Sequence, residues 1–366
     1  MNWNSRDDTL ACLAGVTAQA GALDATVTLV DNGSTDGSIA AVKKRFPSVR
    51  LLPLGKNFGF TGGLAAGLKR SPGRNVIFLN NDATPEDGWL ATLVEAMESA
   101  PEDVVSVGGK IVDPSGKLVD FVGGVMTFDG HAFQNSFRYP LASIDEPQAG
   151  AELLFACGGN MISRRDALLA LGGFDDDYFA YLEDVDFGWR TWLSGKRATY
   201  EPRAVVRHKS SATSNRLGDF ERGVLFERNA LQTVLKNAES LRDASAAFYA
   251  FLYRLHHYAT RRNRKTQELT RPPMTGKHKP ATIDDPLTAM QFRALEWIFA
   301  NEPRIAEKRA DVQRARTRPD AEIFTRFPLH VVPTYPGDET LMASALFREL
   351  LPEGTVRKAL SEILKQ

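Results

Sequence analysis

Short apolar runs alternate with helix-length segments through the first 110 residues, and this alternation strongly limits the folds open to the chain. Helices are expected at 38–46, 62–70 and 86–99. Four runs rich in β-branched residues, each followed by polar turn residues, are expected as strands: 26–30, 49–54, 76–79 and 104–107. Continuous apolar runs suit strands covered on both faces. The alternation therefore predicts βαβ units in a Rossmann-like α/β layer structure.

Beyond residue 110 the expected elements are shorter and less regular. Hairpin-like pieces with Pro-Ser-Gly at a turn fill the stretch that follows Lys110. Further elements are expected in this order: a strand at 153–157, a helix from about 164, a helix at 182–193, an extended segment at 198–208 and a helix at 217–239. These pieces continue the first unit, so we expect one domain at 1–240.

The last third of the chain differs in composition from the rest. Residues 1–240 carry 24 Lys and Arg against 30 Asp and Glu, a net charge of −6, and residues 241–366 carry the compensating +6. Helices are expected at 248–258, 286–301, 303–316 and 340–351. A basic linker around 261–280 contains Pro272-Pro273. We therefore expect a mainly helical C-terminal region at 241–366.

Composition excludes several classes of protein. The 366 residues are 43% hydrophobic and 25% charged, which is ordinary globular composition and excludes collagenous, wholly disordered and disulfide-stapled chains. Cys12 and Cys157 are far apart and show no zinc-binding spacing. The overall charge of zero indicates no nucleic-acid partner. No apolar run reaches 18 residues and no signal-peptide pattern opens the chain, so a cytoplasmic protein is expected.

Polar side chains follow two of the expected strands. Asp31 comes directly after the run at 26–30, and Asn80-Asn81-Asp82 follow the run at 76–79. The carboxyl ends of parallel strands form the ligand edge of an open sheet. There Asp31 could accept hydrogen bonds from a base or ribose, and Asp82 could bind Mg²⁺ or Mn²⁺. The alternative is structural, because short polar residues at these positions also cap the helices that follow.

A glycine-rich turn leads into the helix expected at 62–70. Its sequence, GKNFGFTGGLAAGL, contains Asn57, Gly59 and Gly62. Glycines let the backbone approach a ligand closely, and a helix N-terminus favours anions such as a diphosphate. The segment matches neither the dinucleotide-binding nor the P-loop fingerprint. By itself it is weak evidence for a phosphate site.

The most informative stretch is FDDDYFAYLEDVDFGWRTW at 174–192. It places Glu183 and Asp184 near a helix start, beside Tyr181 and Trp189, and His208 follows at the end of an extended segment. A carboxylate beside aromatic rings could act as a general base next to a sugar, and a strand-end histidine could complete a metal shell. The alternative is that the acids stabilise the helix dipole and that the aromatics belong to the core.

These signals occur in one order along the chain: VDNGSTDGS, NFGFTGG, NND, GG-N-x-x-S-R-R, GGFDDDYFAYLEDVDFGWR and then His208. This order resembles the family 2 glycosyltransferases of GT-A fold, especially the bacterial rhamnosyltransferase-like members, over residues 2–237. The resemblance implies a Rossmann-like mixed sheet flanked by helices, with a mainly helical C-terminal extension. It also implies inverting transfer of a sugar from a UDP- or dTDP-sugar to a saccharide or lipid-linked acceptor in polysaccharide assembly.

The resemblance also implies roles for individual residues. Asp82 matches the metal-binding carboxylate for Mn²⁺ or Mg²⁺, His208 resembles the histidine that completes the metal shell, and Asp184 of the pair Glu183-Asp184 looks like the base. Asn80 departs from the first Asp of the family's DxD pattern. The residues expected on the donor side are Asn4, Asp31, Asn57, Gly59, Gly62, Asn80 and Asn81. The residues expected on the acceptor side are Gly159, Tyr181 and Trp189.

The beginning of the chain departs from the family pattern. Family members open with a buried strand that leads into a motif like VNWN, whereas Met1-Asn2-Trp3-Asn4 lies inside that motif. The first strand is therefore expected to be absent, so that either the true start lies upstream or another segment fills its place. Two other functions stay open. One is a sugar nucleotidyltransferase, whose glycine-rich start is absent, and the other is a non-catalytic interaction protein on a decayed scaffold.

The C-terminal region carries no motif that assigns chemistry. Eight basic residues outnumber the single acid Glu268 between residues 254 and 280, and they follow an aromatic-rich helix. Such a segment could bring the enzyme to a membrane surface that carries a lipid-linked acceptor. The alternative is a solvated linker after a helix packed in the core. The sequence leaves open whether the protein forms a homo-oligomer.

Overall fold

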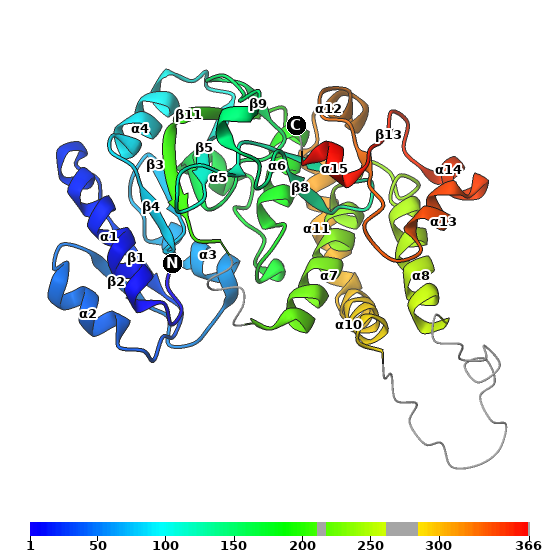
Figure 1. Cartoon of the computed structure of the whole chain (residues 1–366), viewed down its shortest axis with the longest axis horizontal. Helices are drawn as coiled ribbons and strands as arrows, with labels where there is room; N and C mark the ends of the chain where they lie inside the picture. The colour runs from blue at the N-terminus through cyan, green and yellow to red at the C-terminus, as the bar shows by residue number, and fades with distance from the viewer. Residues whose placement is uncertain (211–216, 261–284, 365–366) are drawn as a thin grey trace, which may run out of the picture.

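The computed structural model describes residues 1–210, 217–260 and 285–364 (Figure 1). Its centre is a mixed sheet with the strand order β3-β10-β5-β11-β4, to which β6 adds beside β5 and β9 beside β11. The strands of this sheet are β3 (Asn75–Leu79), β4 (Ala83–Pro85), β5 (Val104–Val112), β6 (Val119–Phe121), β9 (Glu152–Leu153), β10 (Asn160–Arg164) and β11 (Arg197–His208). β5 pairs parallel with β11, and β10 runs antiparallel to both β3 and β5. The carboxyl ends of β3, β5 and β11 therefore share one edge with the start of β10.

Helices cover the sheet, and more of them gather beside it. In Figure 1 the strands lie on the left with α1, α2 and α3, and α7, α8, α10 and α11 lie on the right. The helices of the first part are α1 (Arg6–Ala20), α2 (Ser38–Arg45), α3 (Gly59–Lys69), α4 (Trp89–Ser99), α5 (Arg165–Ala170), α6 (Glu183–Leu193) and α7 (Asp219–Asn237). Those that follow are α8 (Ser245–Thr260), α10 (Pro286–Ala300), α11 (Glu302–Ala315), α12 (Asp320–Arg326), α13 (Asp338–Ala343), α14 (Ala345–Leu350) and α15 (Leu360–Ile363).

The central strands form where the sequence is most continuously apolar. Eight of the nine residues of β5 are buried, and valines and isoleucine dominate it because β-branched side chains pack well on a sheet covered on both faces. β11 is longer than the expected segment by one residue and carries a register shift between Glu201 and Val205. The strand expected at 153–157 shrinks to the two residues of β9. The mixed sheet flanked by helices is the architecture expected from the sequence.

In the part of the chain that the structure describes, three two-stranded sheets are separate from the central one. β1 (Thr28–Asp31) and β2 (Arg50–Pro53) pair in parallel, and β7 (Gly124–Met126) forms an antiparallel hairpin with β8 (Ala132–Gln134). A third pairs β12 (His330–Val331) with β13 (Val356–Arg357). Between β1 and β3 lies a cavity of about 520 Å³, lined by apolar side chains of both strands, of α1 and of α4. Asn2 forms an isolated parallel bridge with Asp31 of β1 beside this cavity, and the expectation about the first strand stays a prediction.

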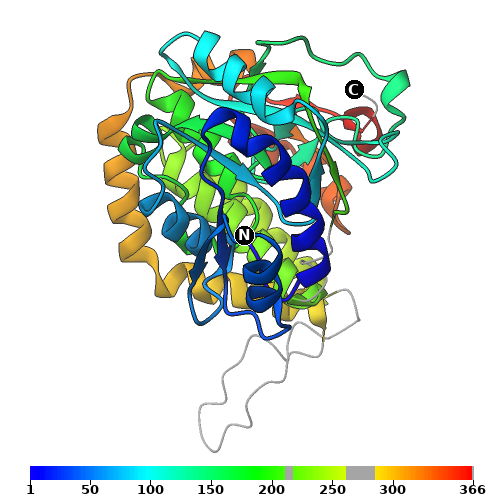
Figure 2. The same cartoon turned by 90° about the vertical axis from the view of Figure 1, so that its left-hand side faces the viewer.

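The helix α1 is a feature that the sequence pattern does not indicate. Its apolar and polar residues are not separated onto two faces, and yet Thr9, Cys12, Leu13 and Ala20 are buried. Figure 2 shows α1 in front, and it packs against β4, α2 and α4. Its start is organised by Asn2, whose Oδ1 accepts from the Ser5 amide (3.2 Å) and the Thr9 hydroxyl (2.9 Å). Tertiary packing therefore determines this helix.

The C-terminal region is helical, as expected, and shares its core with the first part. One cluster of buried apolar side chains includes Trp189 and Trp192 of α6 together with Ile298, Ile305 and Phe324 of α10, α11 and α12. The helix expected at 340–351 is two short helices. Within the described residues no helix combines the length and the apolar character needed to cross a bilayer. The basic linker around 261–280 lies outside the described residues, and the domain division at 240 stays a prediction.

Candidate active site

A cleft of about 590 Å³ opens at the edge of the sheet where β3 and β11 end. Asn80, Asn81 and Asp82 line it directly after β3, and His208 is the last residue of β11. The other lining segments are the turn with Asn57 and Gly59, the stretch from Cys157 to Gly159 before β10, and the loop from Phe179 to Val185. The sequence places these residues far apart, and the shared edge of β3, β10 and β11 brings them together.

Asp82 and His208 face each other in this cleft. The Oδ1 of Asp82 lies 3.1 Å from Nε2 of His208, and Nδ1 of the same ring lies 3.0 Å from Oδ2 of Asp120. Burial opposes the charge of the imidazole, but the hydrogen bonds to Asp120 and Asp82 outweigh it and raise the pKa of His208 to about 9. Burial of Asp82 is likewise outweighed by His208, so the pKa of Asp82 is lowered.

This pair has the donor set of a divalent cation site. Asp82 offers a carboxylate oxygen, and His208 offers an imidazole nitrogen once a cation displaces the Nε2 proton; this mixed set suits Mn²⁺ and related cations. Asp120 engages the other ring nitrogen and so orients the imidazole, as carboxylates commonly do for metal-bound histidines. The residues therefore fit a metal. Asp120 is missed by sequence reasoning, because nothing in the short strand β6 distinguishes it from a surface acid.

A second group of acids has the spacing of a metal site but is already neutralised. Asp175, Asp176 and Asp177 lie close enough to hold an ion together. However, Lys308 contacts all three carboxylates, and Lys236 lies 2.6 Å from Asp175. Because ammonium groups occupy these oxygens, the triplet is an ion-pair cluster.

The acid pair Glu183-Asp184 stands at the N-terminus of α6, at the wall of the cleft. Asp184 accepts hydrogen bonds from the backbone amides of Gly158 (3.3 Å) and Val185 (2.9 Å). Burial raises the pKa of both carboxyls, and with the added repulsion of Asp184 it raises that of Glu183 to about 8. Glu183 is therefore mainly protonated at neutral pH. Asp184 accepts hydrogen bonds from two backbone amides, an arrangement that suits a carboxylate.

The glycine-rich turn is held by Asn32, a buried residue that sequence reasoning missed. Its Oδ1 accepts from the amide of Phe58 (3.0 Å), and its Nδ2 donates to the carbonyl of Gly59 (2.8 Å) and to Oδ1 of Asn57 (2.9 Å). Gly59 has a φ of +77°, and a Cβ there would lie 2.4 Å from the carbonyl oxygen of Phe179. Only glycine allows the turn to approach the loop before the acid pair so closely.

Three residues expected on the donor side lie outside the cleft lining. Asp31 is buried, and its two oxygens accept from the Asn2 side chain (2.8 Å) and the Ser34 amide (2.9 Å). Asn4 accepts from the amide of Thr35 (2.7 Å). Gly62 lies within α3, where a Cβ would meet Phe58. In this structure all three shape the walls behind the cleft, and their contact with a donor stays a prediction.

The residues expected on the acceptor side divide in the same way. Gly159 and Tyr181 line the cleft. Trp189 does not, because it is only 2% exposed, donates from Nε1 to Asp320 (3.0 Å) and packs edge-on against Phe324. The expectation that Trp189 contacts the acceptor is therefore corrected, because its indole packs between α6 and α12. The motif could not reveal this, because α12 lies some 130 residues away in the sequence.

Comparison with known proteins agrees with this geometry. The model of the family "Glycosyl transferase family 2" matches residues 2–172. The N-acetylglucosaminyl-diphospho-decaprenol L-rhamnosyltransferase of Mycobacterium tuberculosis is 31% identical over 213 residues, which cover 51% of this chain and 68% of that protein. The glucosyl-dolichyl phosphate glucuronosyltransferase of Haloferax volcanii is 30% identical over 164 residues, 42% of this chain and 49% of that protein.

Among solved structures, the chain is similar to S. aureus TarS 1-349 in complex with UDP. The identity is 16% and the TM-score 0.48, with 89% of each chain covered. A likeness at this level carries no argument about function. The assignment rests instead on the family match and on the mycobacterial relative, more than two thirds of which is covered. The chain therefore belongs to the family 2 glycosyltransferases, and within them it is rhamnosyltransferase-like.

Proposed function

We propose that the chain catalyses inverting transfer of a sugar from a UDP- or dTDP-sugar to a saccharide or lipid-linked acceptor, in polysaccharide or glycoconjugate assembly. The observation that carries this proposal is that the pair Glu183-Asp184 and the pair Asp82-His208 line the same cleft. Family membership supports sugar transfer, and the mycobacterial relative, named for a diphospho-decaprenol acceptor, supports a lipid-linked one.

Asp184 is the proposed general base. In an inverting displacement the acceptor hydroxyl attacks the anomeric carbon while the nucleoside diphosphate leaves from the opposite face. The hydroxyl loses its proton in this step, and a carboxylate within reach can accept it. Glu183 is mainly protonated at neutral pH, because burial raises its pKa to about 8. Asp184 is therefore the member of the pair that takes the proton.

Asp82 and His208 are proposed to hold a divalent cation, Mn²⁺ or Mg²⁺. When bound, such a cation supplies positive charge that neutralises the departing diphosphate. Asp120 keeps Nδ1 of His208 engaged, so that Nε2 stays turned toward Asp82. On the donor side, Asn32 holds the turn of Asn57 and Gly59 at the cleft wall.

The acceptor end of the cleft is proposed to receive an acceptor with an apolar part. The lining contains the apolar side chains Phe133, Phe137, Phe226 and Leu364, beside Tyr181. Burial of apolar acceptor atoms against these rings stabilises binding in proportion to the area removed from water. This lining is compatible with a sugar carried on a lipid diphosphate.

Thermal-shift measurements with UDP-, dTDP- and GDP-sugars, each with and without Mn²⁺, test the donor assignment. A ligand that binds only the folded state raises the melting temperature. We expect a UDP- or dTDP-sugar to raise it, and more so with Mn²⁺. If no donor changes the melting temperature, a non-catalytic scaffold becomes the better explanation.

The Asp184→Asn variant tests the base. We expect kcat to fall about 10²–10⁴-fold, the usual contribution of a general base, while the donor-induced thermal shift is preserved. Asp166→Asn is the matched control, because Asp166 is a fully solvated acid on α5. Near-normal turnover by Asp184→Asn would refute the assignment.

A further inference from the structure

The loop directly before the acid pair has an unusual backbone. Phe179, Tyr181 and Leu182 have φ values of +63°, +71° and +63°, although none of them is glycine. Side chains with a Cβ are uncommon in this region, and several such residues together persist only where the surroundings hold them. Because Glu183 follows Leu182 directly, whatever holds this loop also sets the position of the proposed base Asp184.

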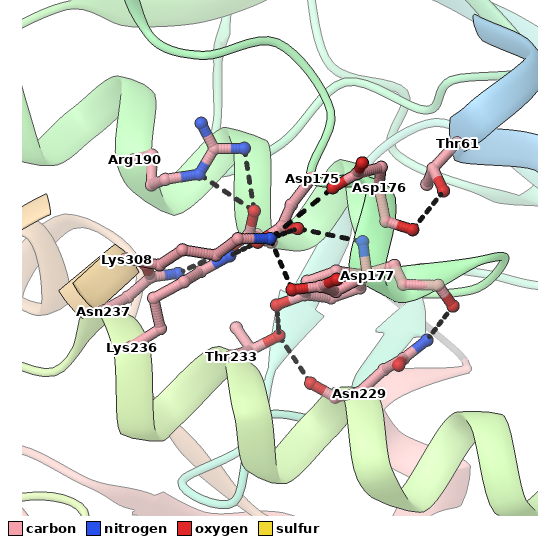
Figure 3. A network of polar contacts seen from close by, with 12 residues as sticks. Thr61, Asp175, Asp176, Asp177, Arg190, Asn229, Thr233, Lys236, Asn237 and Lys308 are labelled. Carbon is pink, nitrogen blue, oxygen red and sulfur yellow. Dashed lines mark hydrogen bonds and ion pairs between the residues drawn. The ribbon is translucent and has the colours of Figure 1, made fainter. Parts of the chain in front are cut away.

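The backbone of the loop is held by α7. Nδ2 of Asn229, which is fully buried, lies within hydrogen-bond distance of the carbonyl oxygens of Tyr178 (3.0 Å), Ala180 (2.8 Å) and Tyr181 (2.9 Å). Arg228 donates to the carbonyls of Asp177 (2.7 Å) and Tyr178 (3.1 Å). Figure 3 shows Asn229 and Thr233 of α7 on one side of the loop. Two neighbouring side chains of α7 thus contact the carbonyl oxygens of four loop residues: Asp177, Tyr178, Ala180 and Tyr181.

The acids of the loop are held by α11, which belongs to the C-terminal region. Nζ of Lys308 contacts the carboxylates of Asp175 and Asp177, and Arg304 lies 2.8 Å from Asp177. Burial opposes the charge of Lys308, but Asp175 outweighs it and raises the pKa of Lys308, so that this lysine stays charged. Figure 3 shows Lys308 reaching the three aspartates from the side opposite Thr61.

The same charges continue into α6, the helix that carries the base. Lys236 of α7 lies 2.6 Å from Asp175 and 2.8 Å from Asp186, which is fully buried two residues after Asp184. Arg190 of α6 also forms an ion pair with Asp186, at 2.8 Å. The loop and α6 are therefore joined by a chain of ion pairs in which basic and acidic side chains alternate, beginning at Lys308.

Loss of the Lys308 charge leaves the aspartates of the loop with fewer positive partners. The side chains of Asp175 and Asp177 are only 7% and 8% exposed, so their mutual repulsion is poorly screened by water. Lys236 and Arg304 remain, but Lys236 contacts one oxygen of Asp175 and Arg304 one oxygen of Asp177. The strained backbone can then relax, and a shift of about 1 Å at a reacting group is enough to cost roughly 10²-fold in rate.

We propose that Lys308, assisted by Arg304, is a positioning residue for catalysis: through the aspartates of the loop, α11 holds Asp184 in its reactive place. This assigns a role to the C-terminal region, which carries no chemical motif. The inference rests on the proposed function of Asp184.

The experiment compares Lys308→Met, which keeps the length of the side chain, with Lys308→Arg, which keeps the charge. We expect Lys308→Met to lower kcat between about 10- and 100-fold with the donor KM changed by no more than about twofold. The loop accepts hydrogen bonds from Thr61 just after the donor turn, but the hydrogen bonds of Asn32 hold the turn itself even where the loop shifts. Lys308→Arg should recover most of kcat. Arg314→Met is the matched control, because Arg314 lies on the same helix in an exposed pair with Asp311.

Unchanged kcat in Lys308→Met overturns the proposal, as does a loss of kcat that Lys308→Arg fails to recover. If Lys308→Met does not fold, the kinetics of Arg304→Met provide the test, because Arg304 is half-exposed. A lower kcat at constant KM in Arg304→Met supports the proposal, and an unchanged kcat refutes it. Amide hydrogen exchange of residues 176–187 separates this outcome from failure of the proposed function. If Asp184→Asn retains turnover, the base is wrong even where Lys308→Met loosens the loop.

Discussion

Raising the pH should weaken the contact between the β7–β8 hairpin and the helices α7 and α8, because of one buried histidine. His131 is 5% exposed and lies between Asp129 (Nδ1 to Oδ1, 3.3 Å) and Glu227 (Nε2 to Oε1, 3.4 Å). Burial opposes its charge, but Asp129 and Glu227 outweigh it and raise the pKa of His131 to about 9. The imidazolium is therefore the stable form in the folded protein at neutral pH.

The sign and size of the effect follow from this shift. A histidine whose pKa is higher folded than unfolded stabilises the fold fully below its unfolded pKa of about 6.5, and this stabilisation is lost as the pH rises through about 9. A difference of about 2.5 pH units at about 1.4 kcal/mol each amounts to about 3 kcal/mol. Between pH 6 and pH 10 the contribution of His131 to the free energy of unfolding should fall by about this amount.

Other charged groups face the same site. Arg254 of α8 lies 2.6 Å from Asp129 and 2.8 Å from Asp338, and Tyr335 packs over Arg254. Burial opposes the charge of Arg254, but Asp129 and Asp338 outweigh it and raise the pKa of Arg254, so that this side chain stays charged over the whole range. A variant that lacks only the imidazole therefore isolates the contribution of the histidine.

Urea unfolding of the wild type and of His131→Gln across this pH range provides the measurement. The free energy of unfolding should fall in both proteins, because the pKa of His208 is also raised to about 9, but the fall should be about 3 kcal/mol larger in the wild type than in His131→Gln, whose side chain stays neutral. His256→Gln, at an exposed position on α8, is the control and should retain the wild-type dependence. Identical pH dependence in the wild type and in His131→Gln would refute the reasoning.

Two further substitutions test the description of the site. Gly59→Ala should raise the donor KM and lower the unfolding free energy, and both effects should be larger than those of Gly37→Ala. Both positions have a positive φ, but only a Cβ at Gly59 meets Phe179. Equal effects of the two substitutions on the donor KM would contradict this account. Trp189→Phe should lower the unfolding free energy by about 1–3 kcal/mol through the lost hydrogen bond to Asp320. Its kcat should stay unchanged, since the indole lies outside the cleft, and a large loss of kcat would restore Trp189 to the acceptor site.

The sequence by itself determined the layer architecture and the chemistry at the sheet edge. The strands β1, β3 and β11 lie within one or two residues of their expected bounds, because continuous β-branched runs have few alternatives to a covered strand. Asp82 and His208, 126 residues apart, meet because β4, which begins directly after Asp82, pairs antiparallel with β11 and places Ala83 opposite His208. Short-range pattern therefore predicted part of the cleft lining, whereas Asn4, Asp31, Gly62 and Trp189 lie outside it.

The tertiary structure alone decided how those residues are supported. Asp120, Asn229 and Lys308 lie outside the motifs, and Asn32 lies inside one that does not reveal its partners. Each acts on a partner that is distant in the sequence, 133 residues away for Lys308 and Asp175. The burial of Trp189 likewise depends on α12. Hydrogen bonds and ion pairs depend on the distance in space between two groups. The packing of α7 and α11 against the first part brings Asn229 and Lys308 to the loop before the acid pair, and contacts within the first part bring Asn32 to the glycine-rich turn and Asp120 to His208.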